Sequence, residues 1–261
     1  MDAVRRVVEL INAGDAFQVN LAHRLSAPFA GSTRALASRL CESLSPWHGC
    51  YIETPAQSNH DIAAVVSMSP ELFLQLSPEG HVRTRPMKGT RPGTASADEL
   101  SLAPKDRAEL AMIVDLMRND LQRVCAVGTV TVTGLHEVET YAHVHQLVST
   151  VTGRLRPGLD ALDAVAASFP AGSMTGAPKR RAVELLAGWE RAPRGVYAGA
   201  FGMLGADGSA DLAMVIRSIV IADRVASVGA GGGITAMSNP EVETAEMHLK
   251  ARALLAALGA E

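Results

Sequence analysis

The chain has 261 residues, of which 48% are apolar and 20% charged, and its net charge at neutral pH is −3. This is the composition of an ordinary globular protein, long enough for one large domain or two small ones with a sizeable core. The small net charge gives no reason to expect nucleic acid or an acidic membrane surface as a partner. No apolar run approaches the length of a bilayer span, so no membrane segment is expected.

The cysteines bear on the compartment. Cys41, Cys50 and Cys125 are odd in number and have no C-x-x-C spacing. They argue for a reducing compartment and against a disulfide framework or a zinc site. The charged residues of the first predicted helix do not fit a signal peptide. We therefore expect a cytoplasmic protein.

The first part of the chain is predicted to combine helices with short strands. Apolar spacing and alternation predict a helix at 3–12, a strand at 17–21 and a helix near 33–44. Two β-like runs, at 49–53 and 61–67, precede a hairpin whose strands cover 72–76 and 81–87. Residues 88–93 (KGTRPG) have the composition of a loop.

The second part continues with a polar then helical segment at 98–123, a β-rich region at 128–153 and a helix near 160–168. A Gly/Pro/Ser/Thr-rich loop at 169–178 opens a basic helix at 179–186. Strands at 196–204, 211–217 and 219–228 lead to a glycine run at 229–233, predicted as a loop. Ser238 or Asn239 then caps a helix that begins at Pro240. Hairpins of strands with interspersed helices indicate an α+β fold with mainly antiparallel sheet.

Two carboxylate pairs have helical i, i+3 spacing: Asp106 with Glu109, and Glu243 with Glu246, the latter sharing a helix face with Lys250. Lys88 and Arg217 are isolated cations, and a charge in the apolar run around Arg217 is costly unless it meets an anion. Three predicted loops, at 88–93, 172–176 and 229–233, can present backbone N–H groups. Together these features predict a site for a small, multiply anionic substrate and a hard cation, for which Mg²⁺ is the best match.

Two other interpretations of the last segments remain. Taken alone, the final helix fits a capped amphipathic helix with solvated Glu–Lys pairs. The glycine run contains G-x-G at Gly229 and Gly231, which invites a dinucleotide-binding interpretation. However, position 234 is Ile and no helix begins until about residue 240, so the fingerprint is incomplete.

Nine segments, spread over nearly the whole chain, carry a family resemblance: AGDAFQVNLAHR (13–24), SPELF (69–73), RPMKGTRP (85–92), KDRAELAMIVDLMRND (105–120), VHQLVSTVTG (144–153), FPAGSMTGAPKRRAVE (169–184), YAGAFG (197–202), VIRSIVI (215–221) and GAGGGITAMSNPEVETAEMHLKA (229–251). In sequence and in order they resemble the chorismate-utilising enzymes, the family of anthranilate synthase large subunit, aminodeoxychorismate synthase component I, and the isochorismate and salicylate synthases. The resemblance implies one chorismate-binding catalytic domain over 1–261, with mainly antiparallel sheets packed with helices in a layered sandwich.

The resemblance also implies binding roles by position. Glu109 and Glu246 resemble the magnesium carboxylates, with Asp106 and Glu243 beside them, and the metal would hold the ring carboxylate of chorismate. The remaining substrate contacts implied are Thr90, Tyr197, Arg217, Lys250 and the backbone of Gly231, Gly232 and Gly233.

Two catalytic residues are implied. Glu71 matches a general acid that protonates the departing C4 hydroxyl, which requires a carboxyl still partly protonated near neutral pH. The segment around Lys88 resembles the P-I-K-G-T of aminodeoxychorismate synthases rather than the P-I-A-G-T of anthranilate synthases. In that branch the lysine attacks C2, and ammonia then enters at C4 and expels it. An exposed loop lysine is the plain alternative. Enzymes that add water at C2 carry Lys where this chain has Gln18, which disfavours isochorismate and salicylate synthesis.

The resemblance, closest to aminodeoxychorismate synthase component I, implies Mg²⁺-dependent amination of chorismate on the way to p-aminobenzoate and folate. A glutamine amidotransferase partner would supply ammonia. The alternatives are anthranilate synthase component I and a non-catalytic chorismate-binding paralogue. There are two departures from the family's pattern: Gln146 stands where other branches carry His, and the chain lacks the usual N-terminal segment. Sheet edges that this segment would cover are therefore expected to be exposed, which makes a homo-oligomer possible.

Overall fold

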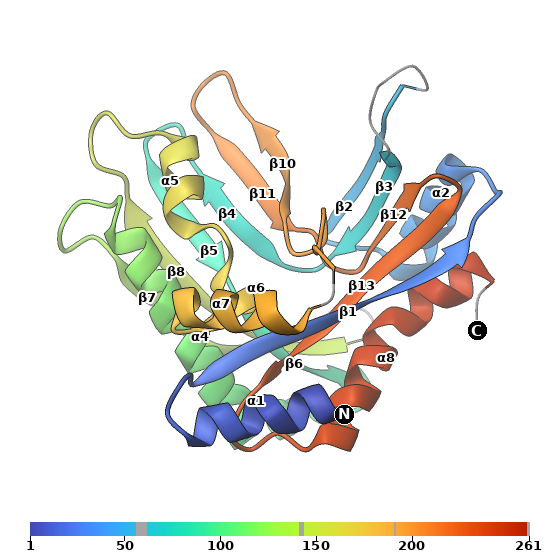
Figure 1. Cartoon of the computed structure of the whole chain (residues 1–261). Coiled ribbons are helices and arrows are strands. Elements are labelled where there is room, and N and C mark those ends of the chain that lie inside the picture. The colour runs from blue at the N-terminus through green and yellow to red at the C-terminus, as the bar shows by residue number, and fades with distance from the viewer. Residues whose placement is uncertain (56–61, 141–143, 191, 260–261) are drawn as a thin grey trace.

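The computed structural model describes residues 1–55, 62–140, 144–190 and 192–259. Its strands form two sheets, of six and of seven strands, with helices packed on them (Figure 1). Every strand pair within these ranges is antiparallel, so the predicted α+β class and layered antiparallel arrangement are confirmed. None of the helices in these ranges is long and apolar enough to cross a bilayer. The prediction of one domain over 1–261 stays a prediction.

The first sheet has the order β2-β3-β12-β13-β1-β9. Its strands are β1 (Gln18–Pro28), β2 (His48–Glu53), β3 (Ile62–Ser69), β9 (Gly176–Ala177), β12 (Ser218–Ala222) and β13 (Val225–Ile234). Four helices cover it: α1 (Asp2–Asn12), α2 (Thr33–Leu44), α7 (Lys179–Trp189) and α8 (Pro240–Leu258). The apolar faces of α2 and α8 form one core with β3, β12 and β13, while α1 and α7 form another with β1.

The second sheet has the order β10-β11-β4-β5-β8-β6, and β7 also pairs with β8. Its strands are β4 (Leu72–Leu76), β5 (His81–Arg85), β6 (Met87–Pro92), β7 (Thr131–Thr140), β8 (Val144–Arg154), β10 (Ala200–Leu204) and β11 (Ala210–Met214). Helices α4 (Pro104–Gln122) and α5 (Ala161–Ser168) pack on it, with the short α3 (Ala97–Ser101) and α6 (Gly172–Thr175) nearby. Leu110, Ile113 and Met117 of α4 are buried in this core, as their spacing predicts.

The chain passes between the sheets at two neighbouring points. Pro70 and Glu71 connect β3 of the first sheet to β4 of the second, and Arg217 lies between β11 of the second and β12 of the first. The Met68 N–H donates to the Arg217 carbonyl at 3.0 Å, and the Met214 N–H donates to the Glu71 carbonyl at 3.0 Å. The two crossings therefore lie side by side, and each carries a predicted site residue.

The prediction that three segments form loops presenting backbone N–H groups is wrong, because all three belong mainly to helices or strands. Residues 88–92 belong to β6, residues 172–177 form α6 and β9, and Gly229–Gly233 lie in β13, paired with β1. A glycine-rich segment is typical of a loop, but glycine is also found within strands, at positions where another group lies too close for a side chain. A Cβ at position 229 would lie 2.3 Å from the Tyr197 ring, which explains why a strand carries glycine here.

Several boundaries also differ from prediction. The strand predicted at 196–204 begins only at Ala200, and the segment 219–228 is split into β12 and β13 by a tight turn. That turn places Asp223 and Arg224 at φ 48° and 61°, the conformation of a two-residue hairpin. Asn239, one of the two predicted caps, accepts from the backbone N–H groups of 241 and 242. Residue 61 of one predicted strand, and 141–143 of the predicted β-rich region, lie outside the described residues.

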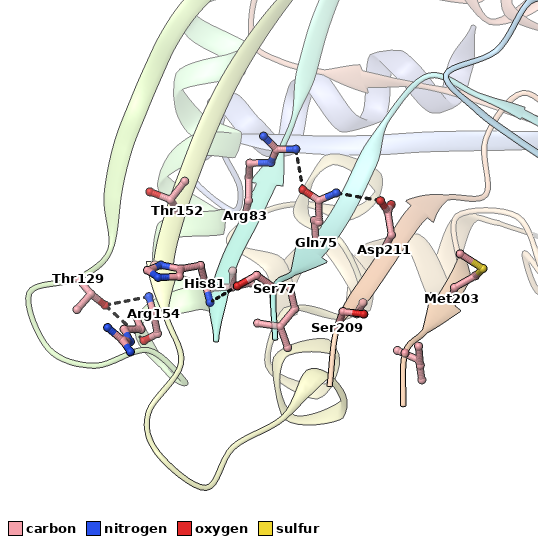
Figure 2. Close-up of a pocket in the computed structure, with 16 residues that line it drawn as sticks. Gln75, Ser77, His81, Arg83, Thr129, Thr152, Arg154, Met203, Ser209 and Asp211 are labelled. Atoms are coloured by element: carbon pink, nitrogen blue, oxygen red, sulfur yellow. Dashed lines mark hydrogen bonds between the residues drawn. The ribbon is translucent and has the colours of Figure 1, made fainter. Parts of the chain in front are cut away.

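Strand β10 lies at the end of its sheet, and its side chains Met203 and Leu204 are 76% and 54% exposed. A hollow of about 950 Å³ lies over the ends of β4, β5, β10 and β11 (Figure 2). Within it Gln75 accepts from Arg83 at 2.7 Å and donates to Asp211 at 2.9 Å. None of the predicted site residues line this hollow, so the predicted chemistry belongs elsewhere.

Candidate active site

A second pocket, of about 670 Å³, lies where the two sheets meet and is bordered by the first turns of α4 and α8. Twelve of the thirteen predicted site residues line it, although they come from segments distant in sequence. They are Glu71, Lys88, Thr90, Asp106, Glu109, Tyr197, Arg217, Gly231, Gly233, Glu243, Glu246 and Lys250. Gln146, which stands where other branches of the family carry histidine, also lines this pocket.

Gly232 is the exception. A Cβ at this position would point toward α8, 3.6 Å from Glu243 Oε2 and 3.8 Å from Lys250 Nζ, whereas one at Gly233 would lie 3.2 Å from Lys88 Nζ. Successive residues of a strand face opposite sides, so Gly231 and Gly233 line the pocket while Gly232 lies against the helix.

Lys88 extends into the pocket from β6. Its side chain is only 13% exposed, and its Nζ lies 4.0 Å from Glu109 Oε2. Burial lowers the pKa of Lys88, and the carboxylate of Glu109 only partly opposes this. The alternative of an exposed loop lysine is therefore wrong. A larger share of the amine is neutral, and so nucleophilic, than for a solvated lysine.

Glu71 is 4% exposed, and its Oε1 has no hydrogen-bond partner in the described part of the chain. Burial raises the pKa of Glu71 to about 7, against the opposing influence of Ser173, Lys88 and Lys250. A carboxyl of this kind is about half protonated at neutral pH, as a general acid requires.

The four predicted metal carboxylates, two on α4 and two on α8, each face a cation. Glu243, 2% exposed, accepts from Ser238 Oγ at 2.7 Å and from Lys105 Nζ at 2.6 Å. The same ammonium lies 3.7 Å from Glu109, whose pKa is raised by burial. Asp106 pairs with Arg91 at 2.9 Å, and Glu246 pairs with Lys250 at 2.8 Å.

These residues fit a hard cation by donor type. Carboxylate oxygens from two helices reach one pocket, and the ammonium of Lys105 between Glu109 and Glu243 shows that a positive charge is held there. Among the described residues, however, no three His, Cys, Asp or Glu side chains are close enough to form a metal-binding group. The carboxylates of α4 and α8 can approach one another further only if Lys105 moves.

Groups suited to anions line the same pocket. Arg217 Nη1 donates to the Lys250 carbonyl at 2.9 Å, and Lys250 Nζ donates to the Gly231 carbonyl at 3.1 Å. Burial raises the pKa of Tyr197 to about 12, so its hydroxyl remains a donor. Strand β12 pairs with β13 only as far as Val228, so no described strand covers that side of Gly229–Ile234. Part of the predicted backbone donors can therefore face the pocket even though the segment is a strand.

The charges of this pocket balance. Among the described residues that line it, five are cationic and five are carboxylates. The cations are Lys88, Arg91, Lys105, Arg217 and Lys250, and the carboxylates are Glu71, Asp106, Glu109, Glu243 and Glu246. Lys105 and Arg91 are the members that the sequence reasoning missed. The signal for Lys105 was available: it is a cation in the first turn of a long helix, where the helix dipole favours anions.

The contact of Gly229 with Tyr197 gives a stability prediction. Gly229→Ala would place a methyl group 2.3 Å from the ring, so the ring or the strand must shift. We expect a loss of about 1–3 kcal/mol in the free energy of unfolding, measured by urea denaturation. Gly232→Ala in the same strand meets only ordinary contacts at 3.6 and 3.8 Å and is the matched control. Equal losses in the two variants would show that Tyr197 does not constrain position 229.

Known proteins resemble this chain over nearly its whole length. The family model for chorismate binding enzymes matches residues 1–256. An aminodeoxychorismate synthase from Streptomyces pristinaespiralis is 46% identical over 98% of this chain, and the match covers 36% of that protein. An anthranilate synthase component 1 from Streptomyces coelicolor is 45% identical over 98% of the chain and 50% of that protein.

Structural comparison extends the agreement to the fold. The crystal structure of anthranilate synthase component I from Streptococcus pneumoniae superposes with a TM-score of 0.86 and 36% identity, over 97% of this chain and 56% of that one. The chain thus spans between 36% and 56% of the length of these three proteins. The match to the family model over nearly the whole chain shows that it belongs to the family of chorismate binding enzymes.

Proposed function

We propose that this chain catalyses the Mg²⁺-dependent amination of chorismate to 4-amino-4-deoxychorismate, a precursor of p-aminobenzoate and folate. The observation that carries the proposal is the buried amine of Lys88, in one pocket with the protonatable Glu71. The 46% identity to an aminodeoxychorismate synthase supports the same product.

The charge balance of the pocket supports the substrate class. Its five cations and five carboxylates leave no net charge for a lone dianion or a lone dication to neutralise. Chorismate, a dicarboxylate, and Mg²⁺ together add no net charge, so they suit the pocket as a pair. Arg217 and Tyr197 line the same pocket, where one carboxylate of the substrate can accept hydrogen bonds from them.

In the proposed reaction the neutral amine of Lys88 forms a bond to C2 of the ring. The two ring double bonds each shift by one position, the C4–O bond breaks, and the proton of Glu71 converts the departing hydroxyl into water. Ammonia then bonds to C4, the double bonds shift back, and the bond between C2 and Lys88 breaks. Burial serves both residues, because it favours the neutral amine and the protonated carboxyl.

Glu109 and Glu246, with Asp106 and Glu243 beside them, are the residues that would hold Mg²⁺. When bound, the ion would neutralise and orient the ring carboxylate of chorismate. Asp106 and Glu243 lie in the first turns of α4 and α8, where the helix dipoles favour carboxylates, and Glu109 and Glu246 lie one turn further along.

Ammonia is proposed to come from a glutamine amidotransferase partner. Hydrolysis of glutamine by a thiol needs an accessible thiolate. Here Cys125 is buried, with its pKa raised to about 11, and burial also raises the pKa of Cys50. No segment of the sequence resembles a Cys–His amidotransferase site.

Formation of anthranilate is the second candidate, because an anthranilate synthase component 1 is 45% identical to the chain. Lys88 favours the first candidate, since anthranilate synthases resemble one another in having alanine there. The two products differ in the carbon that receives ammonia, C2 for anthranilate and C4 for aminodeoxychorismate, and anthranilate formation also releases pyruvate.

The purified chain should convert chorismate, in the presence of Mg²⁺ and an ammonium salt, into a product with the mass of aminodeoxychorismate. Removal of divalent cations with EDTA should abolish turnover, and added Mg²⁺ should restore it. The measurement is liquid chromatography with mass detection, with a pyruvate assay alongside.

Release of anthranilate and pyruvate would show that the chain has the second candidate function, formation of anthranilate. Calorimetric binding of chorismate without any product would instead identify a non-catalytic chorismate-binding protein. Turnover that survives EDTA would refute the role of the metal.

A further inference from the structure

We infer that Lys105 is an internal competitor for the metal: its ammonium bridges Glu109 and Glu243 and must leave when Mg²⁺ binds. Lys105 would thereby set the affinity of the pocket for Mg²⁺. The inference rests on the proposed function, because it assumes that these carboxylates hold Mg²⁺.

The geometry of the bridge is the first observation. Lys105 Nζ lies 2.6 Å from Glu243 on α8 and 3.7 Å from Glu109 on α4. One monovalent cation thus joins the two helices at the carboxylates proposed for the metal. A divalent ion bound by both carboxylates would have to lie within the same space, so the two cations exclude each other.

Helix stability does not account for a lysine at this position. Lys105 lies in the first turn of the 19-residue helix α4, directly after Pro104, where a positive charge opposes the helix dipole. The pair with Glu109 has lysine on the N-terminal side, which is the weaker orientation of an i, i+4 pair. A locally unfavourable choice of this kind is expected where the residue serves a site.

The two partners differ in their freedom to move. The side chain of Lys105 is 36% exposed, whereas those of Glu109 and Glu243 are 9% and 3% exposed. Glu243 also accepts a hydrogen bond from Ser238 Oγ at 2.7 Å, which does not involve the lysine. The flexible stem of Lys105 can therefore turn toward solvent while the carboxylates stay in place.

The test compares Mg²⁺ binding by wild type and by Lys105→Met, which keeps most of the side-chain volume and removes the charge. Without chorismate and at constant ionic strength, we expect Lys105→Met to bind Mg²⁺ about ten-fold more tightly. Its thermal midpoint should be lower than that of wild type without Mg²⁺ and should rise further when Mg²⁺ is added, because the ion relieves repulsion between Glu109 and Glu243. Isothermal calorimetry and thermal denaturation with MgCl₂ measure both effects.

Arg118→Met is the matched control. It removes one positive charge from the same helix, at an exposed pair with Asp115, and should leave Mg²⁺ affinity within about two-fold of wild type. Lys105→Arg keeps the charge and should not bind Mg²⁺ more tightly than wild type. It also tests the inference if Lys105→Met fails to fold, since tighter binding by Lys105→Arg would overturn it.

The outcomes separate the inference from the function on which it rests. If wild type binds no Mg²⁺ and gains no stability from it, the proposed metal site fails. If wild type binds Mg²⁺ and Lys105→Met binds it equally or more weakly, the competition is refuted, and Lys105 instead orders the carboxylates for the ion.

Discussion

Lys88→Ala should lose amination of chorismate by a factor on the order of 10³ or more while still binding chorismate. The amine is the group that attacks C2 in the proposed reaction, and a methyl group cannot replace it. Binding should persist because Arg217, Tyr197 and the carboxylates remain in the pocket. Product formation is measured by mass, and chorismate affinity by calorimetry.

Lys88→Arg separates charge from nucleophilicity. Arginine keeps the positive charge near Glu109, but its guanidinium stays protonated and cannot attack carbon. If arginine restores turnover to near the wild-type rate, the lysine acts through its charge and the covalent step is excluded. In wild type without ammonia, intact-protein mass should show an adduct of chorismate minus water, and this adduct should be absent from both variants.

Glu71→Gln has two expected effects. Loss of the proton donor should lower turnover by about 10²–10⁴. The amide should also stabilise the fold at neutral and alkaline pH, because burial raises the pKa of Glu71 to about 7 and makes its ionised form costly. The difference in free energy of unfolding between variant and wild type, measured by urea denaturation, should grow by about 2 kcal/mol between about pH 5 and pH 8.

The direction of this pH dependence follows from the number of protons that the folded and unfolded chains bind. Between the ordinary glutamate pKa of 4.5 and about 7, the folded chain keeps a proton on Glu71 that the unfolded chain releases. Wild-type stability from this group therefore falls as the pH rises through that window and is level above it. Glutamine does not titrate. The exposed Glu99→Gln is the control for removal of one carboxylate, and a Glu71→Gln difference with the same pH profile as this control would mean that Glu71 is ionised in the fold.

The sequence correctly predicted those helices whose buried face follows from the spacing of apolar residues within the helix. The stripe of Val4 and Val7 and the spacing of Leu110, Ile113 and Met117 gave real helices, since one periodicity decides which face is buried. The prediction of a loop at the glycine run was wrong because the conformation of this segment depends on its pairing with β1 and on the contact of Gly229 with Tyr197. Neither partner is a neighbour in sequence.

The candidate site was likewise predicted only in part from the residues themselves. Spacing paired Asp106 with Glu109 and Glu243 with Glu246, and their charges grouped these pairs with Lys88, but only family resemblance added Glu71 before the fold was known. Lys105 escaped both approaches. Its partner Glu243 is 138 positions away, so the bridge becomes visible only when α4 and α8 are placed in space.

The two crossings at Glu71 and Arg217 have a consequence for folding. Each of these residues belongs to the connection between sheets rather than to either sheet, and their backbones are tied together through Met68 and Met214. A partly folded chain with only one sheet formed would possess neither the acid nor the guanidinium in its working place. Ligand can then bind only the complete structure and stabilises only that state. Bound ligand should therefore make the two sheets unfold together, as one cooperative unit.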